Sequence, residues 1–277
     1  MDLDKSRIKI ESLIKETEEE IYEALAYTEN LKSKIKKHRK LMKANRWKDI
    51  KIITDNFKNI PEPPEQKDYD EDSKIIELPE PDKDIIKKEN IYNCITERES
   101  RRKYSDESLS LKELSYLLYA TQGVRERNDN YHKKTVPSGG ARQPFETYIA
   151  VNNIEDLKRG IYRYLIFEHK LLYMKSPDNQ KRLLKDAALG QEFVANSAAV
   201  FFWAALPYRV EWGYFLKSHK IILLEGGHVC QNLYLASESI NCGTCAIGAY
   251  DQEKSDELLE LDGEDEFVIY LAPVGKV

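Results

Sequence analysis

The chain has 277 residues, 41% of them hydrophobic and 33% charged, which is enough for one sizeable core plus an appendage beneath a heavily charged surface. Its formal net charge of −5 gives no support for nucleic-acid binding by the chain as a whole. Four cysteines are too few for a disulfide framework, and the longest apolar stretch, residues 193–207, is too short to span a bilayer. The first residues lack the apolar core of a signal peptide, so we expect a cytoplasmic protein with reduced thiols and no membrane association.

Residues 1–47 contain neither glycine nor proline and are predicted to form a helix. An apolar stripe with a seven-residue spacing runs along it, formed by Ile14, Ile21, Ile35 and Met42 with Leu25 and Leu31 nearby. The stripe is compatible with a short coiled coil, or with a helix that packs on its own domain or on a second subunit. Because Thr28 interrupts the stripe, we favour the packed helix.

Two oppositely charged segments mark the organisation of the chain. Residues 31–51 carry ten Lys or Arg and one acid, whereas residues 61–87 carry ten acids and four Lys. The acidic segment contains Pro-Glu-Pro-Pro and Pro-Glu-Pro-Asp, which is typical of an extended connector. The basic segment could bind an acidic peptide or nucleic acid, but we favour a solvated helix face that the connector partly neutralises. We therefore predict a helical extension over 1–55, a connector over 56–90 and one domain over 91–277.

Residues 91–277 show the mixture of helical and strand patterns expected of one α+β domain. A capping box formed by Ser110 and Glu113 predicts a helix over Leu111–Gln122. Strands are predicted over 146–152, over 160–164 and 170–174 as a hairpin, over 198–205 as a strand buried on both faces, and over 267–273. Helices are predicted over 178–196 and 223–240.

The segment that opens the domain carries a cluster of cations. Arg98, Ser100 and Arg102 alternate along the chain, so an extended segment would turn all three side chains to one side. Two guanidinium groups and a hydroxyl suit a phosphate and a polar ring edge. The alternative is a cluster that is only solvated.

A glycine-containing loop precedes the first strand of the domain. Pro137, Ser138 and Gly139, followed by a second glycine, form a turn whose backbone can approach a ligand closely. An ordinary turn before the strand at Glu146 explains the same residues, and the sequence leaves both interpretations open.

Two later segments have structural explanations. His228, Gln231 and Asn232 share one stripe of a predicted helix, where polar groups usually satisfy neighbouring backbone, so we expect a structural role for His228. Cys242 and Cys245 form a Cys-x-x-Cys that lacks both a second pair of zinc ligands and a thioredoxin-like setting. We predict no metal site, and interpret this small-residue loop as a surface on which a flat ring can lie against the backbone.

The order of these motifs resembles the nitroreductase superfamily, and more narrowly the SagB-type dehydrogenases, whose members include thiazoline and oxazoline oxidases of ribosomally made peptides. The resemblance covers residues 91–277 and rests on Arg-x-Ser-x-Arg, Pro-Ser-Gly-Gly with Gln-Pro, Gly-His-x-x-Gln-Asn-Leu, Gly-Thr-Cys-Ala-Ile-Gly and Pro-Val-Gly. It implies a nitroreductase-like three-layer sandwich with a central, mainly antiparallel sheet. It also implies a homodimer with one FMN at each subunit interface.

The resemblance further implies which residues hold the cofactor. Arg98, Ser100 and Arg102 would bind the FMN phosphate and the pyrimidine edge of the flavin. The other residues would be Pro137, Ser138 and Gly139 reaching the flavin of the partner subunit, Gln191 at the ring edge, Ala246, Gly248 and Ala249 lining the ring near N5, and Lys276 at the phosphate. A backbone N–H beside N5 would stabilise the reduced flavin.

This chain departs from the azoline-oxidising members at one point. Those members resemble one another in a Lys-Tyr pair that serves proton removal, and the matching positions here are Glu211 and Trp212. Glu211 could act as a base if burial raises its pKa. Trp212 can only donate a hydrogen bond from its indole N–H. With Tyr208, these two residues are expected to wall a substrate pocket.

Three functions stay open at this point. The first is a SagB-type FMN oxidoreductase that transfers hydride through flavin N5 and acts on a modified peptide or a small-molecule electrophile; the N-terminal extension favours the peptide. The second is an NAD(P)H-dependent reductase of nitro, quinone or enone compounds, which the missing Lys-Tyr pair favours. The third is a non-catalytic flavin-binding protein that docks a partner through residues 1–50, against which the retained cations of residues 98–102 argue.

Overall fold

A computed structural model describes residues 3–43, 53–127 and 132–277 of the chain. By its internal contacts the chain divides into two compact units, Met1–Lys51 and Ile52–Val277. The predicted connector over 56–90 belongs to the second unit, and its predicted end at residue 90 stays a prediction. No helix within the described ranges combines the length and the apolar character that crossing a membrane requires.

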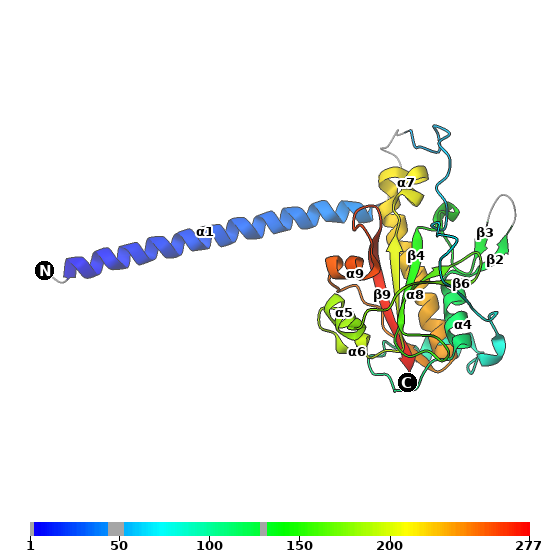
Figure 1. The fold of residues 1–277 in the computed structure, drawn as a ribbon. Coiled ribbons are helices and arrows are strands. Elements are labelled where there is room, and N and C mark those ends of the chain that lie inside the picture. Colours follow the sequence, from blue (N-terminus) through cyan, green and yellow to red (C-terminus); the bar gives the residue numbers. More distant parts are fainter. Residues whose placement is uncertain (1–2, 44–52, 128–131) are drawn as a thin grey trace. The chain divides into compact units, whose positions relative to one another are not determined.

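The first unit consists of one long helix, α1 (Leu3–Met42) (Figure 1). This confirms the helical interpretation as far as Met42, whereas residues 44–47 and the side chain of Ile14 lie outside the described residues. Lys15 and residues 17–43 are all exposed. Thr28, which interrupts the apolar stripe, bonds within the helix, since its hydroxyl donates to the carbonyl of Ala24 at 2.8 Å.

A seven-stranded sheet forms the centre of the second unit, with the order β1-β6-β5-β4-β7-β9-β8. Its strands are β1 (Ile75–Glu77), β4 (Phe145–Val151), β5 (Gly160–Leu165), β6 (Lys170–Lys175), β7 (Ala199–Ala205), β8 (Cys242–Thr244) and β9 (Phe267–Lys276). Each neighbouring pair in this order runs antiparallel. The predicted α+β class with a mainly antiparallel central sheet is therefore confirmed.

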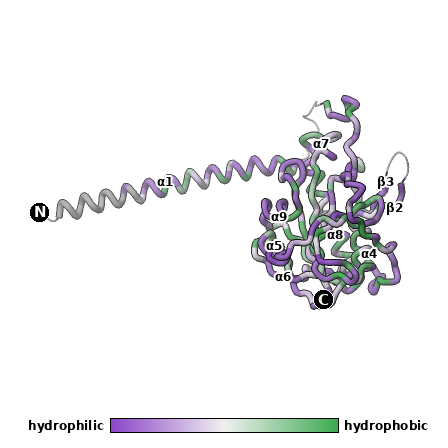
Figure 2. The backbone as a smooth tube through the Cα atoms, viewed as in Figure 1, coloured by the Kyte–Doolittle hydropathy of each residue, from purple (hydrophilic) through white to green (hydrophobic). Residues whose placement is uncertain are grey.

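Alternating side chains of the central strands divide the core into two halves. On β7, Phe201 and Trp203 join one hydrophobic cluster, whereas Val200 and Phe202 join another, because successive side chains of a strand point to opposite faces. The first cluster packs under α4 (Leu111–Gln122) and α8 (Ser218–Ser239), and the second under α5 (Gln180–Ala187), α6 (Glu192–Ala195) and α9 (Gln252–Leu259). Figures 1 and 2 show these helix layers on either side of the sheet, which confirms the three-layer sandwich.

Shorter elements connect the layers. They are η1 (Lys83–Ile85), α3 (Ile91–Glu97), the hairpin of β2 (Val124–Arg127) and β3 (His132–Lys134), η2 (Gly139–Ala141), α7 (Tyr208–Tyr214) and η3 (Phe215–Lys217). Of these, α7 follows the buried strand β7 directly, and η2 leads into β4.

Several local predictions are confirmed, and others are wrong in their bounds. The capping box of α4 is present, with the backbone N–H of Ser110 donating to Glu113 at 2.9 Å. The hairpin of β5 and β6 is also present. The predicted helix over 178–196 is interrupted: α5 ends at Ala187, and Leu189 (φ +53°) and Gly190 (φ +82°) both adopt the left-handed conformation before α6 begins. Helix α8 begins at Ser218 rather than at residue 223, and β9 continues to Lys276.

The connector packs on the rest of the second unit and buries a lysine of the β2–β3 hairpin. The Lys134 side chain is 0% exposed, and its Nζ lies 3.3 Å from a carboxylate oxygen of Glu65 in the connector. Burial lowers the pKa of Lys134 to about 8, because the attraction of Glu65 offsets only part of the cost of removing the ammonium from water. The fold therefore contains one buried amine that is costly to protonate.

This burial predicts a specific pH dependence of stability. The unfolding free energy of the wild type, compared with that of a Lys134→Met variant, should increase as the pH rises from about 8 to 10.5, the ordinary pKa of a lysine. In that range the unfolded chain holds a proton that the folded chain has released, so the gain is on the order of 3 kcal/mol. Urea unfolding at several pH values measures it. Lys133→Met, at an exposed neighbouring position, should show no such trend, and a pH-independent difference for Lys134→Met would contradict the prediction.

Candidate functional site

The buried tyrosine Tyr234 of α8 brings three of the predicted cofactor residues together. Its hydroxyl lies 2.8 Å from the Ser100 hydroxyl and accepts a hydrogen bond of 2.8 Å from the backbone N–H of Ala246. The Arg98 guanidinium lies over its ring, 5.3 Å from the centroid. Residues far apart in the sequence thus meet at a residue that the sequence analysis did not single out, because nothing in the sequence distinguishes Tyr234 from an ordinary core tyrosine.

The segment around Ser100 is held in an extended form against the end of the sheet. Ser100 pairs with Thr244 of β8, and the backbone N–H of Arg101 donates to the Thr244 carbonyl at 3.0 Å. A Cβ on Gly243 would lie only 2.6 Å from the Arg101 side chain, so glycine is needed for this approach. Ser100 and Arg102 are exposed, and the predicted alternation of Arg98, Ser100 and Arg102 stays a prediction.

A basic hollow lies beside this segment. Its volume is about 510 Å³, and it is lined by residues 99–105 and Val277. Arg101, Arg102 and Lys103 contribute three cations to the lining, and the carboxylate of Glu99 pairs with Arg101 at 2.9 Å. This donor set fits a phosphate group, for which guanidinium groups are well suited. Arg98 is not part of the lining, since it lies over Tyr234.

The loop after β8 presents backbone rather than side chains to its surroundings. Ile247 is tied to β9 through its N–H, which donates to the Leu271 carbonyl at 2.8 Å, whereas Gly248 and Ala249 are exposed. A Cβ on Gly248 would meet no atom within 4 Å. Gln191 joins this loop, because its side-chain amide donates to the Ala249 carbonyl at 3.1 Å. The loop therefore leaves open space beside the exposed Gly248 and Ala249, where a ring could approach the backbone.

A backbone N–H beside the ring was predicted for this loop, and the structure narrows the residues that could supply it. The Ala246 N–H is already bonded to Tyr234. Among the described residues, the N–H groups of Gly248 and Ala249 have no recorded hydrogen-bond acceptor. These two, rather than Ala246, are the donors that a ring edge could use.

The loop of Pro137, Ser138 and Gly139 is tied to α8 by a buried carboxylate. The Gly139 N–H donates to Glu225 at 2.6 Å, and the Ser138 hydroxyl accepts from the Gln143 N–H at 3.0 Å. Burial raises the pKa of Glu225, although its hydrogen bonds to the loop act in the opposite direction. No recorded interaction in the described part of this single chain joins the loop to Tyr234. Within the described residues, the loop is therefore held by α8 and by its own hydrogen bonds, and its role toward a cofactor stays a prediction.

Lys276 has a different partner from the one expected. Its ammonium group forms an ion pair with Glu113, the same residue that caps α4. Burial is the largest single effect and would lower the pKa of Lys276, but the hydrogen bond to Glu113 and the attraction of Cys242, Glu113 and Glu107 together raise it. The charge of Lys276 is thus neutralised locally, which weakens its case as a phosphate ligand.

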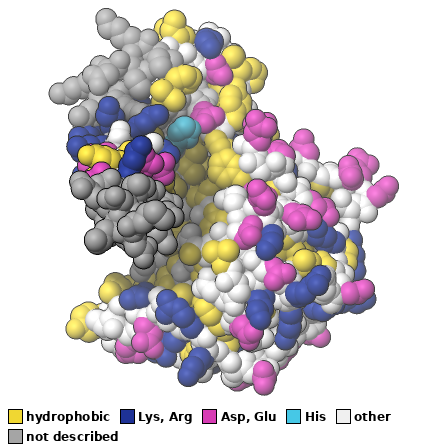
Figure 3. Space-filling view, turned by 90° about the vertical axis from the view of Figure 1, so that its left-hand side faces the viewer, with side chains coloured by type: hydrophobic (Ala, Val, Ile, Leu, Met, Phe, Trp, Pro, Cys, Tyr) yellow, Lys and Arg dark blue, Asp and Glu magenta, His cyan; other side chains and the backbone are white. Residues whose placement is uncertain are grey.

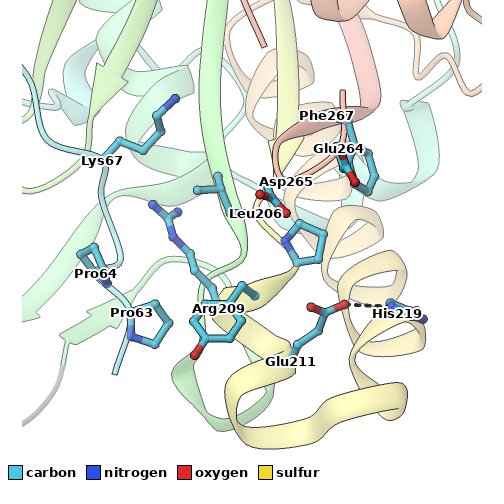
Figure 4. A pocket seen from close by; sticks show the side chains of 12 residues that line it. Pro63, Pro64, Lys67, Leu206, Arg209, Glu211, His219, Glu264, Asp265 and Phe267 are labelled. Carbon is cyan, nitrogen blue, oxygen red and sulfur yellow. Dashed lines mark hydrogen bonds and ion pairs between the residues drawn. The ribbon is translucent and has the colours of Figure 1, made fainter. Parts of the chain in front are cut away.

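A second, larger pocket contains the predicted acid–base residue. Its volume is about 760 Å³, and it is lined by Pro63, Pro64, Lys67, Leu206, Pro207, Tyr208, Arg209, Glu211, His219, Glu264, Asp265 and Phe267 (Figure 4). The Glu211 carboxylate turns toward His219, whose Nε2 lies 3.0 Å away. The Glu211 side chain is 36% exposed, so it lacks the burial that its predicted role as a base was expected to require.

The wall of this pocket depends on a buried ion pair. Arg209 lies 2.5 Å from Glu146 of β4, and each side chain is only 3% exposed. Glu146 also accepts from the backbone N–H of Lys67 at 2.8 Å, which fixes the connector beside α7. The prolines of the connector were interpreted only as spacer residues. Their position in the pocket could not be found from the sequence, because it depends on contacts between residues about 80 positions apart.

Trp212 does not line this pocket, although it was expected to. Its indole ring is 9% exposed, and its Nε1–H donates to the Ile60 carbonyl of the connector at 2.9 Å. The Arg142 guanidinium lies over the ring, 5.0 Å from its centroid. Trp212 therefore holds the connector on the domain.

Two other sequence interpretations have clear outcomes. His228 is exposed, so its expected role of satisfying buried backbone is wrong, whereas Asn232 has that role by donating to the Ala120 carbonyl at 2.8 Å. Cys242 and Cys245 are buried free thiols, and burial raises the pKa of Cys242 to about 12. Figure 3 shows Lys and Arg interspersed with Asp and Glu on the face turned to the viewer, rather than one large patch of a single sign.

Comparison with known sequences gives one family and two curated relatives. The family model for the nitroreductase family matches residues 95–276. MJ1384 of Methanocaldococcus jannaschii, which is named as a nitroreductase, is 33% identical over 201 residues, covering 73% of this chain and 96% of that protein. The trifolitoxin-processing protein TfxB of Rhizobium leguminosarum is 26% identical over 157 residues, covering 54% of this chain. The chain spans only 41% of TfxB.

Two solved structures share the fold. A nitroreductase-type protein of Ralstonia eutropha superposes with a TM-score of 0.62 at 24% identity, covering 79% of this chain and 99% of that one. A chain of the E. coli microcin synthetase McbBCD complex, solved with truncated pro-MccB17 bound, superposes with a TM-score of 0.56 at 20% identity. That match covers 63% of this chain and 66% of the other.

The structural role of Trp212 can be tested against that of its neighbour Glu211. Trp212→Phe keeps a ring under Arg142 but removes the hydrogen bond to Ile60, so the unfolding free energy should fall by about 1 kcal/mol. Glu211→Gln alters an exposed pair and should change stability by less than about 0.5 kcal/mol. Urea unfolding followed by circular dichroism measures both. Equal effects of the two substitutions would contradict this assignment.

Proposed function

Because this chain belongs to the nitroreductase family, we propose that it is an FMN-dependent oxidoreductase of the SagB type. The observation that carries the proposal is the convergence on Tyr234 of Arg98, Ser100 and the Ala246 backbone. It joins the cationic segment to the loop whose backbone is open to a planar ring. This arrangement supports a site in which the phosphate and the ring of one cofactor would be bound side by side.

Bound FMN would supply two-electron chemistry as hydride transfer at flavin N5. The residues of this chain would hold and orient it. Arg102 and its neighbours in the basic hollow would bind the phosphate, Ser100 and Arg98 would bind the polar edge of the ring, and Gly248 and Ala249 would donate backbone N–H groups near N5. Gln191 would keep the Gly248–Ala249 loop in place through its bond to Ala249.

We also propose a homodimer in which the flavin site is completed across the interface. Pro137, Ser138 and Gly139 have a firmly held loop but no link to Tyr234 within the described chain, which is consistent with a role at the partner's flavin. Helix α8 leaves Leu223 and Leu224 more than half exposed, which supplies apolar surface for association.

The pocket around Glu211 would take the substrate. Its volume of about 760 Å³ lies within the range of ligand pockets, and its prolines and aromatic residues supply apolar contacts. The pair of Glu211 and His219 could give or accept a proton during the reaction. The similarity to TfxB, which is named for trifolitoxin processing, supports a modified peptide as the substrate.

An NAD(P)H-dependent reduction of nitro, quinone or enone compounds is the alternative. The absence of the proton-transferring tyrosine of azoline oxidases from the matching position favours it. Here Trp212 occupies it and commits its only polar hydrogen to Ile60.

The basic segment should determine FMN affinity. Replacing Arg98 and Arg102 together by alanine removes two charge-assisted contacts, each worth about 1.5–3 kcal/mol, so the Kd for FMN should rise at least about a hundredfold. Lys254→Ala, on α9 and 54% exposed, is the matched charge control and should leave the Kd unchanged. Quenching of flavin fluorescence measures both. Unchanged affinity in the double variant would refute this location of the phosphate.

The direction of electron flow needs a separate experiment. A visible spectrum of the purified protein, followed by anaerobic addition of NADH and NADPH, distinguishes the two functions. For the dehydrogenase, we expect the flavin absorption band to remain after NADH or NADPH is added and to bleach only when a peptide or another electron donor is added. Rapid bleaching by either nucleotide would make the reductase the correct function, and no flavin after reconstitution would refute both.

A further inference from the structure

Helix α1 carries an exposed apolar stripe with the spacing of a coiled coil. In heptad notation, Ile21, Thr28 and Ile35 occupy a positions, and Thr17, Ala24 and Leu31 occupy d positions. Ile21 and Ile35 are 53% and 52% exposed, so most of their apolar surface is in water. Figure 2 shows hydrophobic turns recurring among hydrophilic ones along this helix. Such a stripe is normally covered by another helix.

The charges of α1 are divided into two blocks of opposite sign. Residues 17–31 contain Glu18, Glu19, Glu20, Glu23 and Glu29 but no Lys or Arg, and residues 32–43 contain six Lys and one Arg but no acid. Like charges four residues apart, such as Glu19 with Glu23 and Lys32 with Lys36, destabilise an isolated helix. The helix dipole favours this order only in the first and last turns, so it does not explain blocks of several turns.

We propose that two copies of this chain associate through α1, with the two helices side by side and antiparallel. In an antiparallel pair, a residues layer against d residues, e residues face e residues, and g residues face g residues. When the midpoint of the pair along its axis lies at the level of Ala26, Ile21 faces Leu31 of the other copy and Ile35 faces Thr17. The remaining core layer joins the small residues Ala24 and Thr28.

The same register pairs the flanking positions. At the e positions, Glu18 faces Lys32 of the other copy, and Leu25 faces its own counterpart. At the g positions, Glu20 faces Lys34, and Tyr27 faces its own counterpart. Opposite charges at e and g positions are the feature that sets partner and orientation in coiled coils. Lys32 already pairs with Glu29 in its own helix at 2.7 Å, but both side chains are exposed, and such a pair contributes little.

A parallel pair fits these residues poorly. There, each g residue faces the e residue five positions further along the other helix, so Glu20 would face Leu25 and Tyr27 would face Lys32. The remaining described pair, Lys34 with Arg39, would repel. The two acidic blocks would also lie against each other, as would the two basic blocks. The charge pattern thus selects an antiparallel second copy over a parallel one, and it does so independently of any flavin chemistry.

Cysteine pairs in the full chain test the orientation. An Ile21→Cys/Leu31→Cys variant should form an interchain disulfide under mild oxidation. On a denaturing gel without reductant, most of the protein should then migrate at twice the mass of one chain. Within one helix these residues are about 15 Å apart, which is too far for a disulfide. Each single variant, like the wild type with its four buried native cysteines, should remain at the mass of one chain.

A charge exchange then tests the flanking pairs in the same double-cysteine background. Glu18→Lys/Glu20→Lys and Lys32→Glu/Lys34→Glu should each reduce cross-linking several-fold at low salt. A mixture of the two proteins should restore it, because all four flanking pairs become complementary again. Circular dichroism of each variant confirms that α1 remains helical.

Each outcome decides the proposal. Cross-linking of the double variant alone, with recovery in the charge mixture, supports an antiparallel pair. Efficient cross-linking of either single variant would show a parallel pair and overturn the register. No cross-linking above the wild type would show that α1 does not bind a second copy and is available to a different partner.

Discussion

The pairing of β4 with β7 is the constraint on which the rest of the domain depends. These strands lie side by side over seven residue pairs, and every residue of both strands is buried. Because both faces of the pair are covered, both sets of alternating side chains must be apolar or internally bonded. Where β4 carries a charge, at Glu146, the carboxylate is paired with Arg209 from α7. The ends of the central strands therefore fix both the sandwich and one wall of the pocket that contains Glu211.

The parts of the fold that the sequence predicts are those governed by local chemistry. The capping box of α4 and the apolar run of β7 each identify one element. A serine with a glutamate three residues later is typical of a helix start, and seven consecutive apolar residues are typical of a strand buried on both faces. The end of α5 at Ala187 could not be predicted in the same way, because the first residue in the left-handed conformation is Leu189, and a leucine seldom adopts it.

The candidate site is less accessible to sequence analysis, because its residues are joined by distant contacts. Arg98 and Ser100 could be proposed from their alternation, but the residue that joins them to Ala246 is Tyr234, more than a hundred positions away. Lys276 was proposed from its place in a motif, and its ion pair with Glu113 is visible only in three dimensions. Trp212 likewise holds the connector rather than walling the pocket. Motif order gives the family, whereas the partner of each side chain comes from the fold.

The proline-rich connector has a consequence for how related chains diverge. Pro63, Pro64 and Lys67 line the pocket, although this segment contributes no strand or helix at these positions. Substitutions of the two prolines change the shape of the pocket without removing a side-chain hydrogen bond, whereas Lys67 is bonded to Glu146 of β4 and paired with Glu266. The shape of this pocket can therefore vary through residues whose composition resembles a simple spacer, and a sequence comparison that discards the connector as a linker would miss them.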